Sequence, residues 1–188
     1  MKMVHETLLF QSPVKDIDFS LDNRFMAVYF KSGKIVIIKK EKLGEFIPVK
    51  NIDFELPNEN YCSLAFSQDG SLLANISSNA NTITVWETRN FSLRYNLDVT
   101  GDTIQKLIFA PNGMDIILLT TTSKLKFYRL RSSPREKDLL HIKDCYQITD
   151  LECMDVWLSS NNKFIVAASK EGTLKVFDYF MRGLPVPS

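Results

Sequence analysis

The 188-residue sequence has few of the residues that carry catalysis or bind metals and nucleotides. Its two histidines, His5 and His141, pair with no cysteine or acid at the spacing of a metal site or a nucleophile–base pair. Its seven glycines form neither a GxGxxG nor a GxxxxGK[ST] phosphate-binding motif. We therefore expect a protein that is not an enzyme, with no catalytic residue, cofactor, metal or small-molecule substrate.

Cysteine, long apolar runs and an excess of one charge sign are also scarce. Cys62, Cys145 and Cys153 are odd in number and include no CxxC pair, which indicates reduced thiols in the core. No apolar run approaches the roughly 18 residues that span a membrane, and the first residues lack the apolar region of a signal peptide. The net charge of +1 makes nucleic acid an unfavourable partner. We expect a soluble protein that resides inside the cell, with no membrane insertion.

What the sequence does contain is a repeat. The repeated segments are VKDIDFSLDNRFMAVYF (14–30), YCSLAFSQDGSLLANIS (61–77), IQKLIFAPNGMDIILLT (104–120) and CMDVWLSSNNKFIVAAS (153–169). Each segment predicts a strand, a turn of Ser, Asp, Asn, Gly or Pro, and a second, nearly all-apolar strand. The turns begin at Ser20, Ser67, Ala110 and Ser159, which are 47, 43 and 49 residues apart. This spacing is near the ~40–45 residues of a four-stranded propeller blade.

Each repeat continues with a short turn and a third strand, and a fourth strand follows in three of them. The third strands read KIVIIKK, TITVWET, KLKFYRL and TLKVFDY, and the weaker fourth strands are expected at 45–49, 93–99 and 139–142. We place the blades at 14–52, 61–99, 104–143 and 153–180, within a propeller domain of residues 1–184 and before a tail of residues 185–188.

These motifs resemble the WD40-repeat family over nearly the whole chain. The SQDG turn of the second repeat and the third strands Thr82–Glu87 and Gly172–Asp178 carry the resemblance. The Trp-Asp signature reads Ile38-Lys39, Trp86-Glu87, Tyr128-Arg129 and Phe177-Asp178, and the Gly-His before the first strand is absent from every repeat. The family's buried Asp-His-Ser-Trp network therefore cannot form in full, and we expect apolar packing in its place, with Trp86 buried.

The resemblance implies an all-β propeller of WD40 type with four recognisable four-stranded blades. Two arrangements of the ring fit the sequence. The segment ETLLFQ (6–11) completes the fourth blade and closes a small ring, or the four blades are a part or short form of a larger propeller. We favour the larger propeller, in which the apolar faces of the first and last blades need a neighbour.

Candidate partner-binding residues lie on the rim where the turns between second and third strands meet the loops that enter the first strands. This predicted site comprises Lys31, Lys34, Asn79, Asn81, Lys124, Lys170 and Glu171. Acids in the neighbouring loops make it a mixed-charge surface suited to another protein: Glu55, Glu59, Asp102, Asp150 and Glu152.

Two further features are weaker candidates. Ser133-Pro134 lies in a loop with Arg131, Arg135 and Lys137 on the opposite rim, and phosphorylation of Ser133 would add negative charge there. Asp16 and Asp18 alternate on a first strand, which we interpret as a solvated channel wall rather than a cation site.

The resemblance implies a non-catalytic scaffold that binds other proteins in a cytoskeletal, ciliary, centriolar or trafficking assembly. It also implies a cytoplasmic protein associated with the cytoskeleton, with the nucleus as the alternative. The alternative is a propeller module of a nucleic-acid or ribonucleoprotein complex, against which the near-zero net charge argues.

Overall fold

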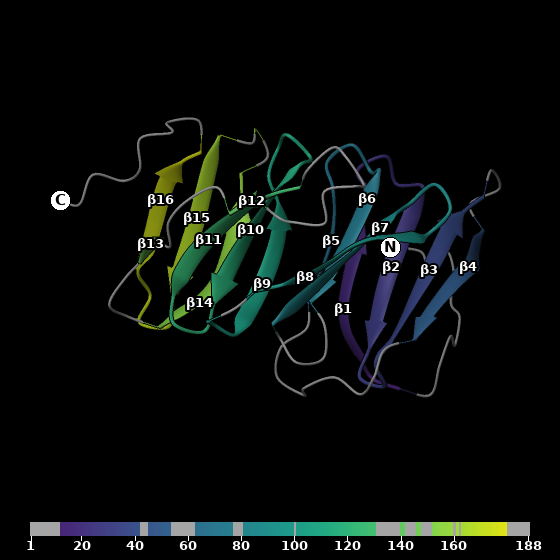
Figure 1. The fold of residues 1–188 in the computed structure, drawn as a ribbon, viewed down its shortest axis with the longest axis horizontal. Coiled ribbons are helices and arrows are strands. Elements are labelled where there is room, and N and C mark those ends of the chain that lie inside the picture. The colour runs from purple at the N-terminus through teal and green to yellow at the C-terminus, as the bar shows by residue number, and fades with distance from the viewer. Residues whose placement is uncertain are drawn as a thin grey trace, which may run out of the picture.

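The computed structural model describes residues 12–41, 45–53, 63–76, 81–99, 101–130, 140–141, 146–147, 152–159, 161 and 163–179. These residues form strands and turns without a helix, and the strands make separate antiparallel sheets (Figure 1). Each sheet corresponds to one sequence repeat, so the prediction of an all-β propeller architecture is confirmed.

The first two blades are four-stranded meanders. Blade one consists of β1 (Val14–Phe19), β2 (Phe25–Phe30), β3 (Lys34–Lys40) and β4 (Phe46–Asp53), hydrogen-bonded in that order. Blade two consists of β5 (Leu64–Phe66), β6 (Leu72–Ile76), β7 (Thr82–Glu87) and β8 (Ser92–Asp98) in the same order.

The last two blades depart from this regular form. Blade three has β9 (Ile104–Phe109), β10 (Asp115–Thr120) and β11 (Lys124–Arg129), and two short strands, β12 (Leu140–His141) and β13 (Tyr146–Gln147), both pair with β11. Blade four has β14 (Cys153–Leu158), β15 (Phe164–Ser169) and β16 (Leu174–Asp178), so it is three-stranded within the described residues. Segments 6–11 and 185–188 lie outside the described residues.

The turns after the first strands of blades one, two and four share a serine hydrogen-bond pattern. In blade one the Ser20 hydroxyl donates to Asp22 Oδ1 (2.7 Å) and accepts the backbone N–H of Phe25 (2.9 Å). In blade two the Ser67 hydroxyl donates in the same way to Asp69 Oδ1 (2.6 Å). The residue after the turn's Asp or Asn has a left-handed backbone, which Asn and Gly adopt at little cost. In blades one to three these residues are Asn23, Gly70 and Gly113, with φ of 56°, 69° and 67°. The turn residues of the repeat therefore determine where each second strand begins.

The blades follow one another along the chain and adjoin through their first strands. β1 contacts β5, β5 contacts β9 and β9 contacts β14. Figure 1 shows blade one in purple and blue at the right and blade four in yellow-green at the left. The contacts between first strands place these strands innermost, where a propeller has its channel.

The hydrophobic core lies between blades rather than within one sheet. Ile35 and Ile37 of blade one pack with Leu64 and Trp86 of blade two, and a similar cluster joins blade two to blade three. Trp86 is buried, as predicted. Because each blade has an apolar face on both sides, a blade without a neighbour leaves one face uncovered.

Candidate protein-interaction surfaces

The predicted rim site contains lysines that pair with acids on the same rim. Lys34 Nζ lies 3.3 Å from Asp53 Oδ1, and Lys170 Nζ lies 3.4 Å from Glu152 Oε2. Lys31, Asn81 and Glu171 are exposed on this rim, whereas Asn79 lies outside the described residues. The described part of this surface carries both charge signs, whereas Glu55, Glu59 and Asp150 lie outside the described residues. The role of this surface in partner binding stays a prediction.

One acid of this rim has a structural role. Asp102 Oδ2 accepts a hydrogen bond from the buried Lys126 ammonium (2.8 Å), and its other oxygen accepts one from the Thr122 hydroxyl (2.9 Å). Lys124 Nζ lies 3.7 Å from Asp102 Oδ1. The hydrogen bond from Lys126 is the main reason that the pKa of Asp102 is lowered. Since Lys126 is buried, Asp102 compensates its charge and is not free to bind a partner.

The channel wall differs from the sequence interpretation. Asp16 and Asp18 are not simply solvated, because Asp16 Oδ2 accepts the N–H of Leu64 (2.7 Å) and Asp18 Oδ2 accepts the N–H of Phe66 (2.6 Å). Burial raises the pKa of both carboxyls, although the backbone hydrogen bonds act in the opposite direction. These side chains connect blade one to the backbone of blade two, a role that depends on neighbouring blades and leaves no local sequence signal.

Other polar links join the remaining blades along the channel. Between blades two and three, the Ser63 hydroxyl lies 3.3 Å from the N of Leu107 and accepts its N–H. Between blades three and four, Lys106 Nζ donates to Asp155 Oδ1 and lies 4.9 Å from the centre of the Trp157 ring. No group of three or more His, Cys, Asp or Glu side chains suited to a metal occurs among the described residues.

Blade one exposes apolar side chains at positions that the interior blades bury. Phe19 of β1 is 51% exposed, whereas Phe66 and Phe109, at the same repeat position, are 7% and 6% exposed. Ile17 is 48% exposed, and its counterpart Leu107 is 1% exposed. Phe66 and Phe109 pack against the preceding blade. We call the exposed face of β1, formed by Val14, Ile17 and Phe19, the leading flank.

Blade four exposes its opposite face. Leu174 of β16 is 67% exposed, whereas its counterpart Leu125 in blade three is 2% exposed and packs against blade four. Val176 and Trp157 are also exposed. We call the face formed by Trp157, Leu174 and Val176 the trailing flank. Both flanks are ends of the same row of blades, so each exposes the side that would face a further blade.

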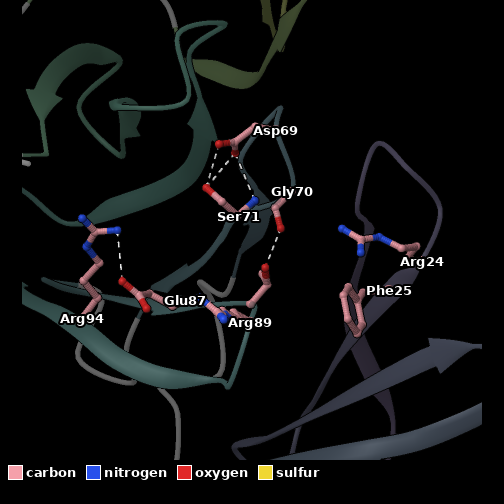
Figure 2. A pocket seen from close by; sticks show the side chains of 9 residues that line it. Arg24, Phe25, Asp69, Gly70, Ser71, Glu87, Arg89 and Arg94 are labelled. Atoms are coloured by element: carbon pink, nitrogen blue, oxygen red, sulfur yellow. Dashed lines mark hydrogen bonds and ion pairs between the residues drawn. The ribbon is translucent and has the colours of Figure 1, made fainter.

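The rim opposite the predicted site has a pocket of about 460 Å³ between blades one and two. Figure 2 shows Arg24 and Phe25 on one side, and Asp69, Gly70, Ser71, Glu87, Arg89 and Arg94 on the other. Sequence reasoning missed it, because its walls come from turns more than 40 residues apart. Ser133, the candidate phosphorylation site of this rim, lies outside the described residues.

Contacts between the turns fix the shape of this pocket. The Phe25 ring packs edge-on against Phe91 of the β7–β8 turn, with 5.5 Å between ring centres. Phe91 has a left-handed backbone (φ 52°), which is costly for an aromatic residue and is held by its surroundings. Within blade two, the Thr88 hydroxyl donates to the Gly70 carbonyl (2.6 Å). The two walls are thus connected through defined contacts.

No described helix has the length and apolar character needed to cross a membrane. No curated protein matches the chain in sequence. Residues 142–178, which include blade four, match the family model of the WD domain, G-beta repeat (WD40).

Solved structures share the fold of the whole row of blades. The β-propeller domain of Cps50 (Swd1) from Myceliophteria thermophila superimposes with a TM-score of 0.68 at 13% identity, covering 91% of this chain and 53% of that one. A chain of the Mitotic Checkpoint Complex has a TM-score of 0.68 at 16% identity, covering 88% of this chain and 50% of that one. The present chain thus spans about half the length of each. The fold is that of a WD40-type β-propeller, the last repeat matches the WD40 family model, and the described blades form part of a propeller.

Proposed function

We propose that this chain is a non-catalytic WD-repeat scaffold that binds other proteins in a multiprotein assembly. The observation that carries the proposal is the exposure of the leading and trailing flanks, where Phe19 and Leu174 occupy positions that interior blades bury. Contiguous exposed apolar surface marks a place where a protein interacts. The interior interfaces show what fits such a face, namely the apolar side of another blade.

We further propose that the assembly is cytoskeletal, ciliary, centriolar or part of a trafficking system. Blades with a poor Trp-Asp signature resemble those of cytoskeletal, ciliary, centriolar and trafficking assemblies, which supports a cytoplasmic, cytoskeleton-associated role. The fold itself does not determine this choice.

Affinity capture with mass spectrometry tests the proposal. The bait is the wild-type chain, a trailing-flank variant with Leu174→Glu and Val176→Glu, and a control with Leu93→Glu. Leu93 is 58% exposed on the outer strand β8, away from both flanks. We expect a defined set of partners to be lost with the flank variant and kept with the control. The same set from all three baits, or no set from any, would argue against a scaffold that works through its flanks.

A further inference from the structure

The pocket between blades one and two contains more guanidinium donors than its own acids accept. Its charged lining comprises three arginines, Arg24, Arg89 and Arg94, and two acids, Asp69 and Glu87. An arginine offers five N–H groups in a planar fork, so three arginines offer many more donors than two carboxylates can accept. The pocket therefore has N–H donors left over for an acceptor group of a bound molecule.

Both acids are already engaged. Asp69 accepts hydrogen bonds from the Ser67 hydroxyl and the backbone N–H of Ser71 (3.0 Å). Burial acts to raise the pKa of Asp69, but its hydrogen bonds together outweigh burial and lower the pKa. Glu87 Oε1 lies 3.2 Å from Arg94 Nη1. The acids therefore hold the walls of the pocket rather than neutralise all of its arginines.

The arginines retain unused donors. Arg94 Nε is buried, and within the described part of the chain it has no hydrogen-bond partner. Arg24 uses its Nε for Asp22, and its guanidinium lies 5.8 Å from the centre of the Phe25 ring. Arg89 is exposed at the mouth of the pocket, and the structure records no ion pair for it among the described residues.

We propose that this pocket binds an acidic side chain of a peptide segment from a partner protein, with Arg89 and Arg24 contacting the anionic group. Arginine forks bind carboxylate and phosphate oxygens in a paired geometry. Phe25 supplies an apolar surface beside the arginines for a neighbouring side chain of the peptide. The volume, about 460 Å³, accommodates one or two side chains rather than an extended polymer.

A peptide fits better than a nucleic acid. A polyanion gains its affinity from a basic face that neutralises many phosphates. Here Asp69, Glu87 and the nearby Asp22 equal the three arginines in number, so the region lacks the excess of positive charge that a polyanion needs. A single anionic group flanked by apolar residues matches this distribution of charge. The inference deepens the proposed function and rests on it, since it gives the chemistry of one partner surface away from the flanks.

Fluorescence anisotropy with labelled ten-residue peptides tests the inference. The probes share one sequence of alternating Phe and a variable residue, which is Glu, phosphoserine or Gln. The proteins are the wild type, Arg89→Glu, Arg24→Gln and a control, Lys163→Glu. Lys163 is exposed on the same rim in blade four, so the control makes the same charge change far from the pocket. Thermal melts verify that every variant is folded.

We expect an anionic peptide to bind the wild type and the Lys163→Glu control. Arg89→Glu should raise the dissociation constant about tenfold or more, because like charges then meet at the mouth. Tighter binding of the phosphoserine peptide, with the same dependence on Arg89, would assign the site to phosphate. Equal binding of the Gln peptide, equal loss with the control, or no binding up to about 1 mM would overturn the inference. In that case a capture experiment in which the flanks are needed would leave the scaffold function intact.

Discussion

The interior interfaces and the two flanks are built from the same repeat positions, but only the interior ones are covered. Phe66 and Phe109 are buried against a preceding blade, whereas Phe19 of the leading flank is 51% exposed. Leu125 is buried against blade four, whereas Leu174 of the trailing flank is 67% exposed. Apolar residues at these positions therefore join neighbouring blades. Their exposure therefore indicates a missing neighbour rather than an unusual surface.

The two tryptophans should show the largest difference in stability between an interior interface and a flank. Trp86 is 5% exposed in the interface of blades one and two, and Trp157 is 48% exposed on the trailing flank. Trp86→Ala should lower the free energy of unfolding by about 3–5 kcal/mol, because it empties a core aromatic site. Trp157→Ala should change it by about 1 kcal/mol at most in the isolated chain, because this half-exposed ring loses little more than its contact with Lys106. Urea denaturation measures both, and equal losses would remove the distinction between interior and flank.

The paired leucines give the same test at a smaller scale. Leu125→Ala should cost about 2–5 kcal/mol, while Leu174→Ala at the matching position should cost little. The same substitution is made at two repeat positions that differ in burial, so side-chain chemistry is controlled. A large loss at Leu174 would show that this part of the flank is covered after all.

The buried carboxyl of Asp18 in the channel should make the stability of the fold depend on pH, whereas the apolar side chains of the flanks should not. Burial raises the pKa of Asp18 above its ordinary value of 3.8, even though Phe66 and Phe19 donate backbone hydrogen bonds to it and Lys106 favours its charged form. Asp16, the other carboxyl close by, raises it further. Folding then favours the protonated form, so the contribution of Asp18 to stability is greatest below pH 3.8 and falls as the pH rises through the folded pKa.

Asp18→Asn should remove this dependence, because an amide oxygen can still accept the N–H of Phe66 without the cost of burying a charge. Unfolding measured from pH 3 to pH 7 should show less loss with rising pH in the variant than in the wild type. Asp115 is the control of opposite sign. Burial acts to raise its pKa, but its hydrogen bonds and ion pair with Arg129 together outweigh burial and lower the pKa. Its contribution is present above pH 3.8 and is lost as the pH falls through the lowered value. If the stability of the Asp18→Asn variant depends on pH in the same way as that of the wild type, this assignment is wrong.

The rim lysines should have the smallest effect on stability. Lys31→Glu combined with Lys170→Glu should leave the melting temperature nearly unchanged, because exposed ion pairs contribute about 0–1 kcal/mol. If this rim binds the main partner, the same change should abolish its capture. Lys124 is left intact, since it lies beside the Asp102–Lys126 pair. Lys50→Glu combined with Lys163→Glu makes the matched charge change at exposed lysines away from this rim. If the rim variant still captures the partner, Lys31 and Lys170 are not part of the partner-binding site.

The sequence predicted the features that depend on local chemistry. The Ser20–Asp22 and Ser67–Asp69 turns, the strands that follow them and the burial of Trp86 all agree with the structure. Turn residues select their own backbone geometry, and alternation of apolar residues reports a buried face, so both are readable from a single segment.

The features that depend on two blades at once could not be predicted. The links from Asp16 and Asp18 to blade two, and the pocket formed by Arg24 and Arg89, join residues separated by 48 and 65 positions in the sequence. No local pattern encodes such pairs, because the same acid or arginine would suit a solvated turn. The left-handed Phe91 that supports the pocket also carries no signal in its residue type.

Sedimentation velocity of the chain over a range of concentrations tests the central claim most directly. If the leading and trailing flanks are faces that join blades, the wild type should associate as concentration rises. The variant with Leu174→Glu and Val176→Glu should remain monomeric, and the Leu93→Glu control should behave as the wild type. A wild type that stays a sharp monomer and melts cooperatively, with residues 6–11 protected from hydrogen exchange, would contradict the account and favour a closed four-blade ring.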